Sequence, residues 1–308
     1  AAYTRGLIFA RPQPYQRLER LPTVEDISSA KKSFKAISSI SRKKKHKELY
    51  AQPPILEVKD LQKEYPITRH LFKQNKSLKA VKNLSFKLFP GETLGLVGES
   101  GCGKSTLSRA LVNLDTPTSG TIYYDGQELS VLDRSIRKEI QLVFQDPFAA
   151  LHPLKTIGDA IAEPLRVHRL VNDKKQCAER VMTLLEQVGM EADFYDRYPH
   201  ELSGGQRQRV VIARALATEP RLLILDEAVA ALDISVQAQV LNLLNDLKKE
   251  LQLSYLFISH DLNVVKYMAD RIMVMEKGIL VEEGEADELY FHPKQPYTKD
   301  LIKALPII

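Results

Sequence analysis

The strongest structural signal in the chain is Gly98-Glu99-Ser100-Gly101-Cys102-Gly103-Lys104-Ser105, which matches the phosphate-binding pattern G-x-x-x-x-G-K-[ST]. Its flanks fit, because the apolar run Thr93–Val97 predicts a strand before it. A helix is predicted after it, from apolar residues at helical spacing: Leu107, Ala110, Leu111 and Leu114. In this setting the glycines let backbone N–H groups surround a phosphate. Lys104 is then placed to reach the β- and γ-phosphates, and the Ser105 hydroxyl to ligate Mg²⁺.

A pair of carboxylates ends the apolar strand predicted at residues 222–225. Enzymes with a phosphate-binding loop (P-loop) need such carboxylates opposite the phosphates. We expect Asp226 to hold Mg²⁺ through water, and Glu227 to polarise the attacking water as general base. An acidic pair after a strand is weak evidence alone, but together with a P-loop it is strong.

Further strands are predicted near residues 55–61, 81–88, 140–144 and 255–259, and a mostly helical stretch includes Lys174–Gly189. Several of these strands are apolar throughout and are separated by helices. This order is typical of a mainly parallel sheet that is covered on both faces.

Composition narrows the class of protein. The 308 residues are 44% hydrophobic and 27% charged, as in an ordinary globular protein. No apolar run approaches the roughly 18 residues of a membrane span, and the first residues lack the pattern of a signal peptide. The two cysteines are too few for a disulfide framework or a four-thiolate metal site. A reducing, cytoplasmic setting fits best.

The positive charge is concentrated near the N-terminus. Residues 1–50 hold 12 Lys/Arg against 4 Asp/Glu, a net charge of +8, so the other 258 residues carry a net charge of −3. The basic block 42–47 could contact nucleic acid or anionic lipid. Interspersed serines and few aromatic residues favour a solvated linker instead, and we expect a basic, Ser-rich linker over residues 13–54.

A weak repeat joins the two ends of the chain. Residues 3–12 share Tyr, Thr, Leu, Ile, Ala and Pro at identical offsets with residues 297–306. Chance is one explanation for segments this short. The alternative is that residues 1–12 are the tail of a preceding copy of the same module, in which case the chain is the C-terminal half of a tandem protein.

The sequence Leu202-Ser203-Gly204-Gly205-Gln206 resembles the signature motif of the ATP-binding cassette (ABC) family. Physically it is a second phosphate cradle, because Ser203 can cap the following helix and leave its first amides facing an anion. The resemblance implies an α/β fold: a P-loop NTPase (RecA-like) core with an antiparallel β-subdomain and an inserted α-helical subdomain at about 150–217. The nucleotide-binding domain is then expected at 55–285, with a C-terminal extension at 286–308.

The resemblance also implies that two cassettes pair head to tail, so that each ATP lies between one P-loop and the opposite signature. Catalysis is assigned to Lys104, Glu227 and His260, the last as the switch histidine near the γ-phosphate. Mg²⁺ is assigned to Ser105, Gln145 and Asp226. Nucleotide contacts, with Tyr65 stacking on adenine and Asp233 in the D-loop, are assigned to Tyr65, Gly98, Glu99, Ser100, Gly101, Cys102, Gly103, Lys104, Ser105, Thr106, Gln145, Ser203, Gly204, Gly205, Gln206 and Asp233. The simpler alternatives are a strand-edge Tyr, a strand-end Gln and a structural His.

Several shorter segments resemble the oligopeptide/dipeptide/nickel importer ATPases: 145–153, 163–165, 198–203, 291–293, 296–298 and the extra segment 68–79. This implies hydrolysis of ATP to ADP and phosphate, two transmembrane permease subunits and an extracytoplasmic solute-binding protein. It also implies a peripheral position at the cytoplasmic face of the inner (plasma) membrane and no nucleic acid partner. We expect no iron–sulfur cluster, because the C-terminal stretch has no Cys.

Two other classes of ABC protein compete with the importer. A soluble tandem ATPase acting on ribosomes gains some support from the basic linker. A chromosome or DNA-repair ATPase does not fit, because Lys104 and Ser203 are only 99 residues apart and leave no room for a long coiled coil.

Overall fold

The computed structural model describes residues 9–23, 26, 34–67, 76–129 and 136–305. The chain divides into two compact units. Unit 1 consists of Ala1–Lys43 and Lys138–Leu253, and unit 2 consists of Lys44–Arg137 and Ser254–Ile308. The first copy of the terminal repeat lies mostly outside the described residues, as does most of the extra segment 68–79.

The P-loop follows the central strand of a sheet in unit 2. That strand, β3 (Thr93–Val97), pairs in parallel with β8 (Ser254–Ile258) and β9 (Arg271–Glu276), and β9 pairs antiparallel with β10 (Ile279–Glu285). All residues of β3 and β8 are buried, as expected for strands covered on both faces. The expected parallel strands are confirmed, whereas β9 and β10 were not predicted.

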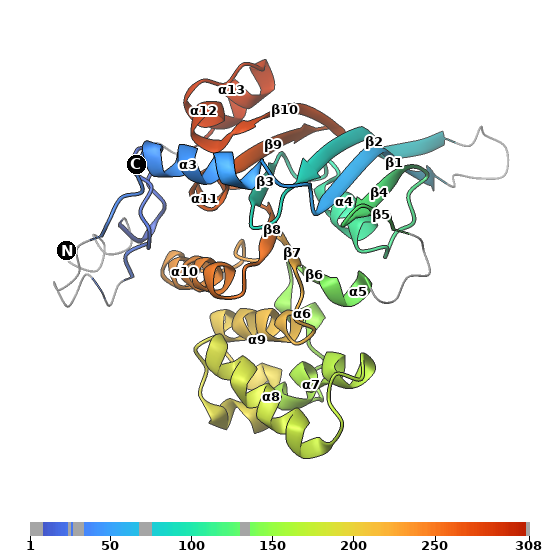
Figure 1. Cartoon of the computed structure of the whole chain (residues 1–308), viewed down its shortest axis with the longest axis vertical. Coiled ribbons are helices and arrows are strands. Elements are labelled where there is room, and N and C mark those ends of the chain that lie inside the picture. Colours follow the sequence, from blue (N-terminus) through green and yellow to red (C-terminus); the bar gives the residue numbers. More distant parts are fainter. Residues whose placement is uncertain (1–8, 24–25, 27–33, 68–75, 130–135, 306–308) are drawn as a thin grey trace. The chain divides into compact units, whose positions relative to one another are not determined.

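A second sheet in unit 2 is antiparallel, in the order β2-β1-β4-β5 (Figure 1). It consists of β1 (Leu56–Ile67), β2 (Lys76–Leu88), β4 (Ser119–Tyr124) and β5 (Gln127–Glu128). Its strands alternate, and in β2 the side chains of Leu84, Phe86 and Leu88 are buried while those between them are exposed. This sheet confirms the antiparallel β-subdomain.

Unit 1 contains a parallel strand pair and a group of helices. The strands are β6 (Ile140–Val143) and β7 (Leu222–Asp226). The helical group is formed by α6 (Pro147–Ala150), α7 (Ile157–Val167), α8 (Lys174–Gln187), η1 (Ala192–Asp196), η2 (Pro199–Glu201) and α9 (Gly204–Leu216) (Figure 1). This group confirms that a helical subdomain is present. Helix α10 (Ile234–Glu250) follows β7 after a short loop.

The segment expected as a solvated linker is partly ordered. Its basic block belongs to helix α3 (Ser39–Leu49). Leu21 is buried beside α10, next to Asn242, which is only 2% exposed. The Leu21 N–H donates to Asn242 Oδ1 at 2.8 Å, and Asn242 Nδ2 donates to the Leu21 carbonyl at 2.9 Å. Arg20 forms an ion pair with Asp246 on the same helix at 2.7 Å. The linker therefore differs from the expectation, because an isolated leucine and backbone groups attach it to α10.

The remaining helices complete the element order: α4 (Lys104–Leu111), α5 (Ile136–Glu139), α11 (Leu262–Met268), α12 (Ala286–Phe291) and α13 (Pro296–Lys303). Helix α4 is shorter than predicted. Asn113 adopts a left-handed conformation and Leu114 is 61% exposed, so Leu114 does not belong to the apolar face of the helix. Among the described helices, none combines the length and apolar character that a membrane span requires.

Candidate nucleotide-binding site

The P-loop bends sharply between β3 and α4. At Gly103 the backbone is left-handed, with φ +111°, and a Cβ placed there would approach the carbonyl oxygen of Ala80 to 2.2 Å. Only glycine fits this position. Because Gly103 stands at the N-cap of α4 and has no side chain, the first amides of the helix are left to an outside acceptor.

Lys104 is held inside the P-loop and is only 4% exposed. Its ammonium donates to the carbonyl oxygens of Gly98 at 2.8 Å and Glu99 at 2.9 Å. The cation therefore sits where the loop would surround a phosphate. Burial raises the pKa of the Cys102 thiol, although the nearby Lys104 opposes this effect. Cys102 therefore serves as a small buried side chain in the loop and not as a reactive thiolate.

Tyr65 lies beside the P-loop. Its hydroxyl donates to Asp115 Oδ2 at 2.8 Å, and it also interacts with the side chain of Thr106 in the first turn of α4. Burial, reinforced by Asp115, raises the pKa of this phenol. The ammonium of Lys63 lies 5.1 Å from the ring centroid, so the ring already takes part in a cation–π contact.

The structure brings His260 to the P-loop edge of the sheet. The Ser259 N–H donates to the Leu96 carbonyl at 3.2 Å, and Leu96 pairs with Ile258. His260 follows β8 as Gly98 follows β3, so both lie beyond the carboxyl ends of neighbouring parallel strands. Ligands of parallel α/β sheets bind at this edge. The side chain of His260 is exposed there.

In unit 1, two predicted residues meet directly. Because β6 and β7 are parallel, with Val143 opposite Leu225, the residues that follow both strands lie at one edge. Gln145 Nε2 donates to Glu227 Oε2 at 2.9 Å. The backbone of Glu227 is left-handed, with φ +50°, an uncommon conformation for a residue other than glycine. Asp226 ends β7 and is buried, whereas Glu227 is half-buried.

The signature forms a closed capping box at the start of α9. The Ser203 hydroxyl accepts the Gln206 N–H at 3.3 Å, and Gln206 Oε1 accepts the Ser203 N–H at 2.9 Å. Gly205 is required by packing, since a Cβ there would lie 2.2 Å from Val236 Cγ1. Gly204 is not, because its nearest neighbour would be Leu232 at 3.7 Å. Packing within the chain therefore does not explain why position 204 is a glycine.

Asp233 has a local structural role. Its carboxylate accepts the Val236 N–H at 3.0 Å and caps the N-terminus of α10. The capping carboxylate is exposed. The predicted contact of Asp233 with a second cassette therefore remains a prediction.

The predicted Mg²⁺ ligands fit the ion by chemistry. Ser105, Gln145 and Asp226 offer hydroxyl, amide and carboxylate oxygens, the donors that Mg²⁺ prefers. The Gln145 side-chain amide N–H donates to Glu227, so the amide oxygen is the atom that can ligate a cation. Within the part of the chain that the structure describes, no three His, Cys, Asp or Glu residues form a metal site.

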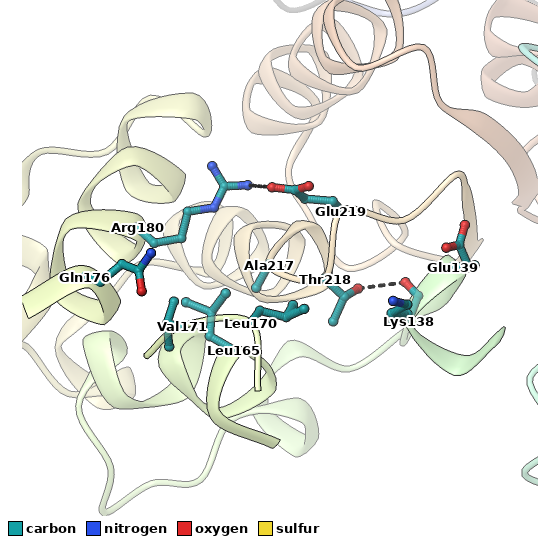
Figure 2. A pocket seen from close by; sticks show the side chains of 10 residues that line it. All are labelled: Lys138, Glu139, Leu165, Leu170, Val171, Gln176, Arg180, Ala217, Thr218 and Glu219. Carbon is teal, nitrogen blue, oxygen red and sulfur yellow. Dashed lines mark hydrogen bonds and ion pairs between the residues drawn. The ribbon is translucent and has the colours of Figure 1, made fainter. Parts of the chain in front are cut away.

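A cavity of about 430 Å³ in unit 1 is a separate feature (Figure 2). Arg180 pairs with Glu219 at 2.6 Å, and the Thr218 hydroxyl donates to the Lys138 carbonyl at 2.9 Å. None of the predicted nucleotide-binding residues lines this cavity. We therefore do not assign it to the nucleotide.

Tyr297 was missed as a candidate. In the sequence, Pro296-Tyr297-Thr298 is only a segment that resembles the importer ATPases. In the structure, the Tyr297 hydroxyl accepts the Glu99 N–H of the P-loop at 3.2 Å. The sequence signal for this contact was the motif itself, which places a Tyr at the start of a helix after Pro.

Known proteins resemble this chain over most of its length. The family model described as "ABC transporter" matches residues 81–230. The dipeptide transport ATP-binding protein DppF of Haemophilus influenzae is 48% identical over 263 residues, which cover 84% of this chain and 80% of that protein. The oligopeptide transport ATP-binding protein OppF of Bacillus subtilis is 50% identical over 260 residues, which cover 82% of this chain and 83% of that protein.

A solved structure supports the fold. It is a dimeric post-hydrolysis state of the ATP-binding cassette MJ0796 bound to ADP and Pi, 31% identical, with a TM-score of 0.67 over 75% of this chain and 98% of that one. The two curated relatives are covered for about four fifths of their own lengths. Neither leaves room for a second cassette of this size, so they do not support the tandem hypothesis.

Proposed function

Since the chain belongs to the ATP-binding subunits of ABC transporters in the dipeptide and oligopeptide import family, we propose that it powers the uptake of short peptides by hydrolysing ATP. The observation that carries this function is the identity of 48–50% with dipeptide and oligopeptide transport ATP-binding proteins, over more than four fifths of the chain. The work is conformational: ATP favours the closed pair of cassettes, and loss of the γ-phosphate releases it.

The side chains that we assign to ATP fall into two sets, and each set is described by itself. Unit 2 supplies the P-loop 98–106, with Tyr65 for the adenine and His260 for the γ-phosphate. Unit 1 supplies Gln145, Asp226 and Glu227. The contacts within each set support this assignment, namely Lys104 with the loop carbonyls and Gln145 with Glu227. Ser203–Gln206 and Asp233 are proposed to serve the nucleotide of the opposite cassette.

The hydrolytic step follows from these roles. Gln145 holds Glu227 through Oε2, and the Glu227 carboxylate is proposed to accept a proton from water. That water attacks the γ-phosphorus in line as the bond to the β–γ bridging oxygen breaks, giving ADP and phosphate. Lys104 and His260 stabilise the charge that develops on the γ-phosphate oxygens. Mg²⁺, held by Ser105, Gln145 and Asp226, would neutralise charge on the β- and γ-phosphates.

The proposed membrane partners are two permease subunits, with a solute-binding protein outside the membrane. An exposed apolar surface near Gln145 supports this proposal. Phe148 is 60% exposed and Val167 is 70% exposed, and a cavity of about 320 Å³ lies between Phe144, Val167 and Val211. Exposed apolar patches of this kind mark protein interfaces. The subunit would then be peripheral, at the cytoplasmic face of the membrane.

The partner of this cassette is proposed to be a second cassette of the same family, and the DppF and OppF relatives described above do not support the tandem hypothesis. The alternative, a soluble ATPase acting on ribosomes, draws on the exposed lysines 43, 44 and 47 of α3. The two functions require different partners, so copurification separates them.

The test has two steps. The full-length protein is purified from gently solubilised native membranes, and two polytopic subunits with a second cassette are expected to copurify. The complex is then placed in liposomes with its binding protein, and uptake of labelled di- and oligopeptides is measured with ATP. Glu227→Gln should keep ATP binding and lower turnover and uptake by about 10²- to 10⁴-fold, the usual contribution of a general base. Ribosomes in place of membrane subunits would establish the alternative.

A further inference from the structure

The C-terminal helix reaches the P-loop through one side chain. Tyr297, in the first turn of α13, accepts the backbone N–H of Glu99 at 3.2 Å. We propose that Tyr297 is a positioning residue: it fixes the P-loop backbone at Glu99, whose carbonyl oxygen holds the Lys104 ammonium, in the conformation that binds nucleotide. This inference rests on the proposed ATPase function. Tyr297 does not belong to any of the motifs assigned to the ATP site.

Both backbone polar groups of Glu99 in the P-loop form hydrogen bonds. The Glu99 N–H donates to Tyr297, and the Glu99 carbonyl accepts the Lys104 ammonium at 2.9 Å. Rotation of the backbone at Glu99 therefore breaks the contact with Tyr297 and displaces an acceptor of the buried ammonium. Because Lys104 is only 4% exposed, it has few other ways to be satisfied.

Tyr297 can act on the loop because its own helix is anchored to the sheet. Just before α13, the N–H groups of Lys294 and Gln295 donate to the two carboxylate oxygens of Glu282 at 2.8 and 3.0 Å. Burial opposes ionisation of Glu282, but the neighbouring Thr298 hydroxyl and the hydrogen bonds from these two N–H groups outweigh it, so the pKa of Glu282 is lowered. Thr298 is fully buried beside it.

The sheet connects this anchor to the loop it serves. Glu282 lies on β10, which pairs with β9, and β9 pairs with β3, the strand that leads into the P-loop. The turn between β9 and β10 contacts the loop as well, through the Gly278 N–H and the Cys102 carbonyl at 2.9 Å. The P-loop is thus held by the hairpin at Cys102 and by α13 at Glu99.

The experiment compares Tyr297→Phe with Tyr290→Phe in the full chain. Each variant loses one phenol hydroxyl and keeps the ring. Tyr290 donates to Asn263 at 2.9 Å, away from the loop, and is the matched control. Titration with a fluorescent ATP analogue gives Kd, steady-state assays give KM and kcat, and thermal unfolding gives Tm.

For Tyr297→Phe, Kd and KM for ATP should rise about three- to tenfold, the effect of losing one hydrogen bond. The kcat at saturating ATP should stay within about twofold, because bound nucleotide restores the loop and Glu227 is untouched. For Tyr290→Phe, Kd and KM should not change. Glu282→Gln, which weakens the anchor of α13, should raise KM in the same direction as Tyr297→Phe.

Equal nucleotide affinity in the two tyrosine variants would overturn the inference. So would a lower Tm and kcat for Tyr297→Phe with unchanged KM, since that pattern describes a purely structural contact. Failure of the unaltered protein to bind ATP is a different result, and it would refute the proposed function itself.

Discussion

The P-loop and the signature are both helix N-termini suited to an anion, but their donors are in different states. At the start of α4, Gly103 offers no cap and the Lys104 cation is held within the loop. At the start of α9, Ser203 and Gln206 satisfy each other's amides. A phosphate at the P-loop gains donors that have no side-chain cap, whereas at the signature it must replace hydrogen bonds that already exist. We propose that the P-loop binds nucleotide without the signature, and that the signature contributes when a second cassette brings its bound nucleotide.

The largest expected effect is on ATP affinity, and it concerns the cation of the P-loop. Lys104→Ala removes the buried cation and its charge-assisted hydrogen bonds, so the Kd for ATP should rise by about 100-fold or more. Isothermal titration of the single cassette measures this. Lys175→Ala is the control, because that lysine is 88% exposed on α8 and should leave Kd unchanged. Unchanged affinity in Lys104→Ala would remove the P-loop from its assigned role.

The next effect uses two glycines, one from each cradle, and is measured as thermal stability. Gly103→Ala places a Cβ 2.2 Å from the Ala80 carbonyl in a left-handed backbone, so we expect a loss of about 2–3 kcal/mol, or about 4–10 °C in Tm. Gly204→Ala meets only Leu232 at 3.7 Å and should change Tm by less than about 2 °C. Equal losses in both variants would mean that the two cradles are equally constrained by packing.

The smallest expected effect concerns the capping box of the signature. Ser203→Ala removes one cap hydrogen bond, which should cost about 1 kcal/mol and lower Tm by about 2–4 °C. Its Kd for ATP, measured at concentrations where the cassette is monomeric, should match that of the unaltered protein. Weaker ATP binding by the monomeric variant would show that the signature contacts nucleotide without a second cassette, and would contradict the proposed difference between the two sites.

The sequence predicts best where one short motif carries the chemistry. The P-loop, the carboxylates after β7 and the Ser203 cap are local patterns, and the structure places them at the ends of the expected elements. Tyr297 could not be found in this way, because its contact joins residues 198 positions apart. Strand β10 was missed because it is mostly polar and only partly buried. Strand β9 has four buried apolar residues, so its signal was present in the sequence and was overlooked. The docking of Leu21 was missed because a lone leucine in a Ser- and Lys-rich segment gives no periodic signal.

The attachment of Leu21 to Asn242 has a mechanical consequence. Asn242 lies about 12 Å along the helix axis from the start of α10, the helix that Asp233 caps. Tension applied to the chain ahead of Leu21 would pass into α10 through two hydrogen bonds and the Arg20–Asp246 ion pair. Because α10 is one continuous helix of 17 residues, the attachment at Asn242 and the D-loop residue Asp233 belong to the same stiff element. The N-terminal segment is therefore mechanically coupled, through α10, to the loop proposed to reach the opposite nucleotide.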